Sequence, residues 1–322
     1  MPRPDAAAPA TSIEPAEAGL LHRRIRDWFA ASARDLPWRR PGCDPWGILV
    51  SEFMLQQTPV VRVLPVWEQW MQRWPRPADL AAESAGEAVR AWGRLGYPRR
   101  ALRLHAAAAA IMDRHGGRVP DDHASLLELP GVGAYTAAAV ASFAFGLPET
   151  VVDTNIRRVH ARLVTGAALP APTLTAAEMR LAQELMPASG TKEWNAGAME
   201  LGALVCTARS PRCDACPVMD RCAWLNAGRP EPHYVPKGQA WAGTDRQVRG
   251  AMMAVLREAE SSVPREILLG SMELAVLPAA YQGPLAALRA LPAGDEQLGR
   301  ALDGLLADGL AVTAGDGISL PG

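Results

Sequence analysis

The 322-residue chain has no apolar run that approaches the roughly 18 residues of a membrane-spanning helix. Residues 1–17 are rich in Ala and Pro and lack the apolar core of a signal peptide. Residues 1–227 show almost no period-two alternation of apolar and polar side chains, which excludes a mainly β structure there. We therefore expect a mainly α, cytoplasmic protein that has no membrane partner.

Lysine is almost missing, because only Lys192 and Lys237 stand among the 33 basic side chains. The net charge is −1, but residues 1–227 carry 25 basic and 23 acidic side chains, whereas the remainder carries 8 and 11. A polyanion would therefore bind to local patches on the first part and not through a global field. The scarcity of lysine also limits where an amine nucleophile could stand.

Cysteine is scarce too, yet four of the five cysteines are close together. Cys206, Cys213, Cys216 and Cys222 have the spacing C-x6-C-x2-C-x5-C. Such a set can bind a four-cysteine iron–sulfur cluster or a tetrahedral zinc ion. Two disulfides are the alternative, disfavoured because nothing indicates export and thiols in a reducing compartment are more often metal ligands. Cys43 stands alone, and we expect an ordinary thiol.

Proline and glycine mark most of the joints between the expected helices. We expect a disordered N-terminus over residues 1–16 and a helical domain over residues 17–227. A linker rich in Pro and Gly follows over residues 228–244. Residues 245–322 would then form a small C-terminal domain.

The small C-terminal domain is expected to contain three helices and a hairpin. The helices are predicted over residues 246–258, 282–290 and 297–308. A short hairpin over residues 311–320 would turn at Gly315-Asp316-Gly317. Helices that close on a two-stranded wing predict a winged-helix-like α/β module.

The sequence Leu-Pro-Gly-Val-Gly, which starts at Leu129, lies between two expected helices. Gly131 and Gly133 bracket Val132, so the backbone can turn tightly and expose consecutive N–H groups at the start of the next helix. Such a site binds a phosphate without side chains. The pattern is typical of a helix-hairpin-helix, here over residues 123–146, which holds the nucleic-acid backbone without reading sequence. A plain helix–helix turn with incidental glycines is the alternative.

Asp153 follows a short apolar run and precedes an expected helix. The simplest interpretation is that it caps that helix, which Asp does well. Capping and catalysis are compatible, because a carboxylate held ionised at a helix N-terminus can stabilise positive charge that develops on a sugar.

The hairpin, the acidic residue one helix later and the four-cysteine loop together resemble the helix-hairpin-helix DNA glycosylases that carry a [4Fe-4S] cluster. The resemblance covers about residues 17–226. It implies a two-lobed helical fold and a [4Fe-4S] cluster, rather than zinc, held by the loop of residues 206–222. The cluster would lock this loop and take no part in base excision. Duplex DNA would be the partner of a monomeric, nucleoid-associated protein.

Two positions distinguish members of this family. Endonuclease III-like enzymes have a lysine just after the Gly-Val-Gly turn, which forms a Schiff base with the sugar. This chain has Tyr135 there, which implies a monofunctional glycosylase without efficient lyase activity. The second position is Glu52, in the string Ser-Glu-Phe-Met-Leu-Gln-Gln-Thr, which resembles the MutY-type adenine glycosylases.

Taken alone, Glu52 could be an ion-paired or solvent-facing side chain. Its apolar neighbours, however, predict partial desolvation, which favours the protonated acid. By the resemblance, Glu52 protonates adenine, Asp153 stabilises the oxocarbenium-like sugar, and Tyr135 orients Asp153 or water. The expected activity is base excision repair by hydrolysis of the N-glycosidic bond of adenine that is mispaired with 8-oxoguanine or guanine.

Other residues are expected to contact DNA by the same resemblance. Gln57 would wedge into the duplex, Tyr97 would intercalate beside the damaged guanine, and Trp38 and Arg39 would lie around the adenine pocket. The full set of expected DNA-binding residues is Trp38, Arg39, Gln57, Tyr97, Gly131, Val132, Gly133 and Asn155. Two departures from the family are Pro98, where a second tyrosine is common, and Ala196, where Gln or Glu is common.

The C-terminal region departs most from the MutY type. From Arg229 onward there is no Phe and only His233, and the region is too short for the usual Nudix-like domain. It is acidic, and we do not expect it to bind DNA. The alternatives are a thymine or uracil mismatch glycosylase, an endonuclease III-like lyase, an electron-transfer iron–sulfur protein and a damage-binding protein without catalysis.

Overall fold

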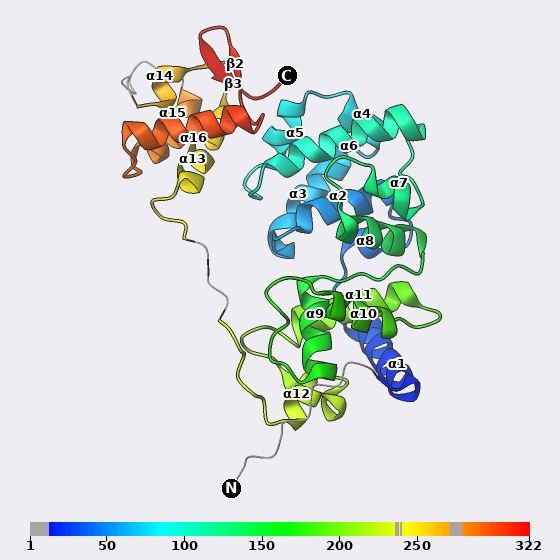
Figure 1. Ribbon diagram of the computed structural model, residues 1–322. Helices are drawn as coiled ribbons and strands as arrows, with labels where there is room; N and C mark the ends of the chain where they lie inside the picture. The colour runs from blue at the N-terminus through cyan, green and yellow to red at the C-terminus, as the bar shows by residue number, and fades with distance from the viewer. Residues whose placement is uncertain (1–12, 236–237, 239, 271–278) are drawn as a thin grey trace. The chain divides into compact units, whose positions relative to one another are not determined.

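The computed structural model describes residues 13–235, 238, 240–270 and 279–322. For residues 279–281 it describes the backbone alone. Most of the expected disordered N-terminus, residues 1–16, lies outside the described residues, as does part of the expected linker. The described chain is mainly helical, which confirms the predicted fold class (Figure 1). No described helix is both long and apolar enough to span a membrane.

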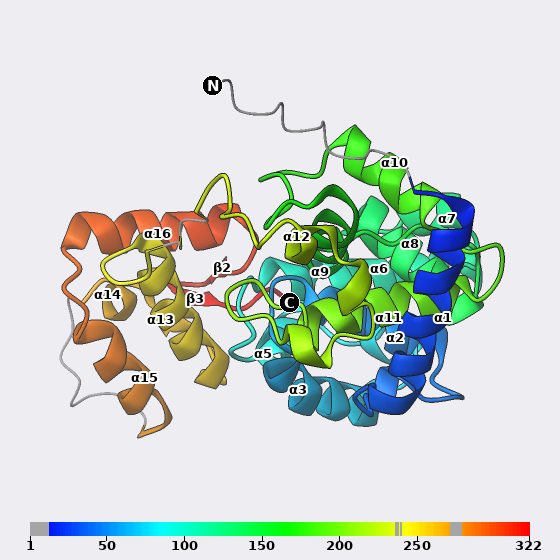
Figure 2. The same ribbon diagram turned by 90° about the horizontal axis from the view of Figure 1, so that it is seen from below.

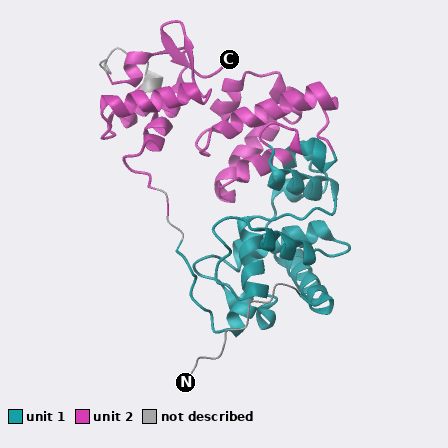
Figure 3. Ribbon diagram, viewed as in Figure 1, with its two compact units in different colours: residues 1–48, 121–126, 132–237 teal, residues 49–120, 127–131, 238–322 magenta. Residues whose placement is uncertain are grey.

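The chain divides into two compact units (Figure 3). Unit 1 comprises residues 1–48, 121–126 and 132–237, and unit 2 comprises residues 49–120, 127–131 and 238–322. The first elements are α1 (Pro15–Ser32), η1 (Pro37–Arg39), α2 (Pro45–Leu55), α3 (Val60–Arg73), α4 (Pro77–Ala81), α5 (Ala85–Trp92), α6 (Arg99–His115), α7 (His123–Leu127), α8 (Ala134–Phe145) and α9 (Thr154–His160). They are followed by η2 (Ala161–Thr165), α10 (Ala176–Glu184), α11 (Thr191–Leu204), η3 (Cys213–Ala215), η4 (Met219–Arg221) and α12 (Ala223–Asn226).

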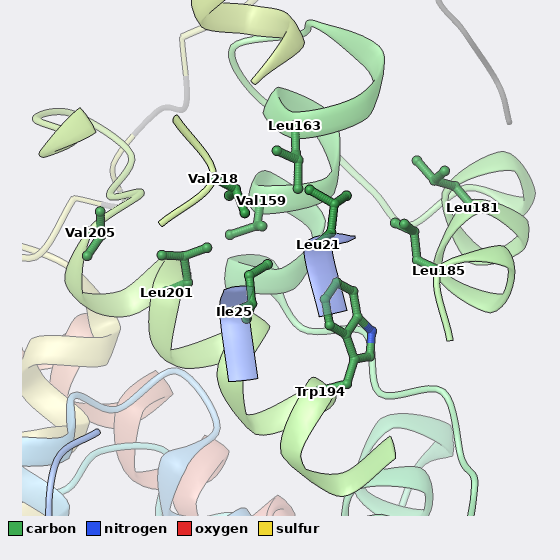
Figure 4. Packing of buried hydrophobic residues seen from close by; sticks show 10 residues of the cluster. All are labelled: Leu21, Ile25, Val159, Leu163, Leu181, Leu185, Trp194, Leu201, Val205 and Val218. Atoms are coloured by element: carbon green, nitrogen blue, oxygen red, sulfur yellow. The ribbon is translucent and has the colours of Figure 1, made fainter. Parts of the chain in front are cut away.

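Helix α11 is central to unit 1. It packs along α1 and against α9, and all three lie together in both ribbon views (Figures 1 and 2). Their apolar faces contribute to one core, which includes the fully buried Trp194 (Figure 4). The core residues are Leu21, Ile25, Val159, Leu163, Leu181, Leu185, Trp194, Leu201, Val205 and Val218. This core also supports the cysteine loop, because Cys206, Cys216 and Cys222 pack against it.

Tryptophans organise the first part of unit 2. Helix α6 packs against α4 and α5 (Figure 1). The Trp70 ring meets the rings of Trp74 and Trp92 edge to face, with centroids 4.8 and 5.5 Å apart. The Trp70 indole N–H donates to the Ala91 carbonyl oxygen at 3.0 Å, so its one polar atom is satisfied inside the core.

The C-terminal residues form a helix–strand–helices–hairpin module. Its elements are α13 (Asp245–Glu258), β1 (Val263–Pro264), α14 (Arg265–Leu268), α15 (Ala279–Arg289), α16 (Asp295–Ala307), β2 (Val312–Ala314) and β3 (Gly317–Ser319). The sheet is antiparallel with the order β1-β3-β2, and Ile318 pairs with both Val263 and Thr313. The expected hairpin is present as β2 and β3, and Gly315 has the positive φ of 59° that the expected turn requires, whereas the winged-helix-like module stays a prediction. The sequence did not predict β1, because a two-residue strand carries no alternation.

Within unit 2, the chain end meets α5. The Gly86 N–H donates to the Pro321 carbonyl oxygen at 2.7 Å, and a Cβ at Gly86 would lie 2.3 Å from that oxygen. From α13, the Arg257 Nε donates to the Val89 carbonyl oxygen at 3.1 Å. Only glycine at position 86 allows this close approach of the two backbones.

Candidate active site and iron–sulfur loop

Asp153 caps helix α9, as its position in the sequence predicts. Its Oδ1 accepts a hydrogen bond from the Ile156 backbone N–H at 2.7 Å. Its Oδ2 accepts one from the Asn155 side-chain amide at 2.8 Å. Both carboxylate oxygens therefore have donors at the positive end of a helix dipole, which favours the ionised form.

Burial acts in the opposite direction on the same group. It raises the pKa of Asp153 above the ordinary value, while the donors from Ile156 and Asn155 and the charge of Arg158 oppose the rise. The net result is a raised pKa. Asp153 is thus a carboxylate held by amides, with no guanidinium bonded directly to it in the described structure.

A chain of hydrogen bonds connects Asp153 to the cysteine loop. Arg158 donates to the Asn155 side-chain oxygen at 2.8 Å, and Asn155 in turn donates to Asp153. The same guanidinium donates to the carbonyl oxygens of Gly202 and Cys206, each at 2.7 Å. Asn155, expected to contact DNA, therefore also positions Asp153, a role that sequence analysis did not assign.

Helix α11 approaches the start of α9 very closely at Gly202. A Cβ there would lie 2.7 Å from the Asn155 Cβ and 2.8 Å from the Asn155 carbonyl oxygen. A larger residue at position 202 would push the first turn of α9 away from α11. The position of Asp153 thus depends on a small residue that lies about 50 positions later in the chain.

Tyr135 lies in the first turn of α8. Its half-buried side chain packs against an apolar cluster that includes Val151, two positions before Asp153, and Ile156, three positions after it. Unit 1 thus brings Tyr135, Asp153 and Asn155 to one region. No lysine lies in this segment, because Tyr135 occupies the position just after the turn.

The expected hairpin is present, with α7 and α8 joined by the Gly-Val-Gly turn. Gly131 has a φ of 80°, and a Cβ there would lie 2.6 Å from the Arg103 Cβ, so glycine is required twice over. Gly133 is the N-cap of α8, where no side chain accepts a hydrogen bond from the first turn. Val132 is buried and anchors the turn. The start of a helix that no side chain caps is a place where a phosphate can bind.

Glu200 is a buried acidic residue that sequence analysis missed. Its side chain is fully buried, and it accepts bonds from the Arg34 Nε and Nη2 at 2.7 Å each. The Arg39 Nη2 donates to the same carboxylate at 3.0 Å. Burial alone would raise the pKa of Glu200, but the bonds from Arg34 and Arg39 outweigh it and lower the pKa to about 2.

This ion-pair group fixes the segment around Trp38 and Arg39. Trp38 is buried, and the Arg39 guanidinium lies 5.6 Å from the centroid of the Phe29 ring. The sequence contains a feature that could have identified Glu200: like Glu52, it is a glutamate between apolar residues of a helical stretch. The segment expected near the adenine pocket is therefore held by charge pairing.

Unit 2 carries Glu52, Gln57 and Tyr97. Glu52 lies in α2 and is 5% exposed, next to the fully buried Phe53 and Met54. The expected desolvation of its side chain is therefore present. Gln57 and Tyr97 are both exposed and lie at turns, one after α2 and the other just before α6.

The four cysteine thiols are free and half-buried in the loop around η3 and η4. Burial raises the pKa of Cys216 to about 11, and the nearby charges of Cys206, Cys222 and Cys213 add to the rise. Cysteines bind a metal centre as thiolates, and the iron ions of a cluster would supply the positive charge that stabilises this form.

Arg162 provides polar support behind this loop. It donates to the Cys206 Sγ at 3.4 Å and to the carbonyl oxygens of Thr207 and Ala208 at 2.7 and 3.0 Å. Among the described residues, no three His, Cys, Asp or Glu side chains are placed to hold a single metal ion. The fit of the loop to a cluster rests on its thiols, its apolar wall and this arginine.

Comparisons with known proteins agree with this arrangement. Residues 50–184 match the profile of the HhH-GPD superfamily of base excision DNA repair proteins, and residues 206–222 match the iron–sulfur binding domain of endonuclease III. An adenine DNA glycosylase of Mycobacterium tuberculosis is 48% identical over 315 residues, which are 96% of this chain and 97% of that protein. The chain belongs to the adenine DNA glycosylase family. The expected resemblance and the expected [4Fe-4S] cofactor are both confirmed.

Further relatives support the family assignment and the fold. The adenine DNA glycosylase of Mycolicibacterium smegmatis is 47% identical over 306 residues, which are 95% of each chain. A solved structure of a thermostable thymine-DNA glycosylase is 28% identical, with a TM-score of 0.59, and covers 66% of this chain and 98% of that one. This adenine DNA glycosylase family member is thus a DNA glycosylase of the base excision repair type, with the helical fold that the sequence predicts.

Proposed function

We propose that the protein is a monofunctional glycosylase that hydrolyses the N-glycosidic bond of adenine mispaired with 8-oxoguanine or guanine in duplex DNA. The observation that carries the proposal is the cap geometry of Asp153, with an amide donor on each carboxylate oxygen at the start of α9. The names of the relatives that match nearly the whole chain support adenine as the excised base.

Glu52 is the proposed general acid. Adenine leaves poorly as an anion, so a ring nitrogen must be protonated while the glycosidic bond lengthens. Glu52 is 5% exposed, and burial among apolar side chains favours the protonated carboxyl that can supply this proton. The proton moves from the Glu52 carboxyl to the base, and the bonding electrons leave with the base.

Asp153 is the proposed stabiliser of the sugar cation. Departure of the base leaves an oxocarbenium-like sugar, which a carboxylate stabilises electrostatically or by transient bonding, as in glycoside hydrolysis. Its amide donors keep the carboxylate in one orientation. Tyr135, which packs beside the residues flanking Asp153, is proposed to orient Asp153 or the water that completes the reaction.

The remaining residues are proposed to bind and open the duplex. The N–H groups after Gly131, Val132 and Gly133 would hold a phosphate. Extrusion of adenine from the stack costs free energy, which Gln57 and Tyr97 would offset by insertion. Trp38 and Arg39 are proposed at the adenine pocket, and Asn155 beside it.

The cluster has a structural role in this proposal. Cys206, Cys213, Cys216 and Cys222 would hold it, and when bound it fixes the loop that Arg158 and Arg162 connect to α9 and η2. Base excision by Glu52 and Asp153 needs no electron transfer. We propose that the protein works as a monomer on nucleoid DNA in the cytoplasm.

A thymine or uracil mismatch glycosylase is the second candidate, because a thymine-DNA glycosylase shares the fold at 28% identity. The discriminating experiment uses purified protein with duplexes that contain A opposite 8-oxoguanine, A opposite G, A opposite C, or T opposite G. Alkali then cleaves any abasic site. We expect cleavage at A opposite 8-oxoguanine and opposite G, none at T, and loss of activity in Glu52→Gln. Release of T without release of A would replace the proposal with the second candidate.

A further inference from the structure

Two exposed residues of unit 2 have an unusual backbone conformation. Among the residues that the structure describes, the non-glycine residues with positive φ are Gln57 at 54°, Tyr97 at 50° and Arg229 at 60°. A left-handed conformation costs free energy for a residue with a side chain, and it persists only where the surroundings enforce it. Gln57 and Tyr97 are 40 positions apart in sequence, so a neighbour that enforces both conformations has to be sought in the fold.

The common neighbour of both turns is Arg100, in the first turn of α6. Its Nη1 donates to the carbonyl oxygens of Phe53 and Met54 at 3.0 and 3.2 Å, and also to that of Gln56. These carbonyls belong to the last turn of α2 and the residue just before Gln57. A cation is favourable there, because the last carbonyls of a helix have no partner within the helix and carry partial negative charge.

The other half of the guanidinium holds the second turn. The Arg100 Nη2 donates to the Gly96 carbonyl oxygen at 3.1 Å and to the Thr58 Oγ1 at 3.0 Å. The Arg100 guanidinium is therefore bonded to the peptide group before Gln57 and to the peptide group before Tyr97. Thr58 strengthens the connection, because its Oγ1 also lies 3.4 Å from the Leu95 carbonyl oxygen.

The ring of Tyr97 lies against this same group. The Arg100 guanidinium carbon is 5.2 Å from the Tyr97 ring centroid and 5.5 Å from that of Trp92. Tyr97 is nevertheless 47% exposed, whereas Arg100 is 6% exposed. Burial lowers the pKa of Arg100 to about 10, so the side chain stays charged at neutral pH.

We propose that Arg100 is a positioning residue that holds the backbone at Gln57 and at Tyr97, so that both side chains are placed together to open the duplex. It acts through the peptide groups on the N-terminal side of both residues and does not contact the reacting atoms. The inference rests on the proposed function, because Gln57 and Tyr97 insert into DNA only in that proposal. Its consequence is that the two side chains depend on each other through one buried guanidinium.

Arginine is required at this position by geometry as well as by charge. A guanidinium has five N–H donors in a fixed plane, whereas a lysine ammonium is a point charge with three donors. Arg100→Lys therefore keeps the charge but cannot hold both turns at once. The matched control is Arg76→Lys, the same change at an exposed arginine of unit 2 that precedes α4 and bonds to Asp79, three residues later.

The experiment measures single-turnover excision of adenine, at saturating enzyme, from two duplexes. In one, A opposite 8-oxoguanine lies in fully paired DNA. In the other, mismatches flank the adenine and weaken its stacking, so little wedging is needed. We expect Arg100→Lys to slow excision at least tenfold on the paired duplex and less than threefold on the weakened duplex. Arg76→Lys should match the wild type on both. A similar loss on both duplexes, or no loss on the paired one, would overturn the inference.

A second measurement keeps the inference testable if Arg100→Lys is less stable. Arg100→Lys is added to a variant with Gln57→Ala and Tyr97→Ala, and the paired duplex is used. If Arg100 acts through these two side chains, the added change lowers the rate less than twofold. A full tenfold further loss would contradict the proposal. Absence of adenine release by the wild type would instead refute the proposed function, which is a separate result.

Discussion

Asp153 and Glu200 are two carboxylates of unit 1 whose pKa values are shifted in opposite directions. Glu200 is fully buried and bonded to two guanidinium groups, and its pKa is lowered to about 2. Asp153 accepts hydrogen bonds from the Ile156 backbone N–H and the Asn155 side-chain amide, and its pKa is raised. The charge of Glu200 is neutralised by two bonded arginines, whereas the geometry of Asp153 is fixed by neutral donors and no cation is bonded to it directly in the described structure.

The difference in hydrogen-bond donors shows how one helical unit can hold one carboxylate for stability and another that is open to a further cation. A carboxylate already paired with arginines gains little from a further cation, whereas one held by neutral donors attracts it. The Arg158 guanidinium bonds to Asn155, Gly202 and Cys206, and it acts on Asp153 through its charge alone. This arrangement fits the proposed role of Asp153 opposite a developing sugar cation.

The largest expected effect that tests the comparison comes from Asp153→Asn. The variant keeps the cap and removes the charge, so adenine excision should fall by about 10³-fold, the size seen when a preorganised electrostatic contact is lost. The measurement is single-turnover excision, with DNA affinity from a duplex containing an abasic analogue as the control. The free energy of unfolding should fall by about 1–3 kcal/mol, because one of the two oxygens that accept a hydrogen bond is replaced by an NH2 group. Retention of more than about a tenth of the activity would contradict the role of Asp153.

A second large effect is expected at Tyr135. The wild-type protein has no lysine beside Asp153, so borohydride should trap no covalent complex with substrate DNA above background. Tyr135→Lys places an amine in the first turn of α8 and should produce a trapped complex, detected as a shifted band on a denaturing gel. Tyr135→Arg is the control, because it adds charge without a nucleophilic amine. Efficient trapping by the wild type would show that the protein is a lyase.

Glu200→Gln should affect mainly stability, where Asp153→Asn affects mainly excision. The pKa of Glu200 is lowered from 4.5 to about 2 in the folded protein, which contributes about 3 kcal/mol to the free energy of unfolding at neutral pH. Since the pKa is lowered in the folded state, this stability is present above pH 4.5 and is lost as the pH falls toward 2. Denaturant unfolding at pH 7 and at pH 3 measures it, and the difference between wild type and variant should shrink at pH 3. An equal difference at both values would refute the ionic contribution.

The sequence predicted the features that depend on neighbouring residues. The glycines of the hairpin, the cap at Asp153 and the cysteine spacing all lie within short segments, so their geometry follows from local rules. Glu200 was missed because its partners, Arg34 and Arg39, lie more than 160 positions away. The role of Arg100 was missed for another reason: most of its partners are backbone carbonyls, which leave no pattern of residue types.

The smallest expected effect separates the two carboxylates most finely. The Asn155 amide favours the ionised form of Asp153, so Asn155→Ala should raise the pKa of Asp153 further and move the acidic limb of the pH–rate profile to higher pH. Single-turnover rates between pH 4.5 and 8 measure the shift. Asn195→Ala is the matched control, because that amide donates to Ser142 and to the Glu149 carbonyl and does not touch Asp153. An unmoved acidic limb in Asn155→Ala, with a rate lowered equally at every pH, would mean that Asn155 acts on DNA and not through Asp153.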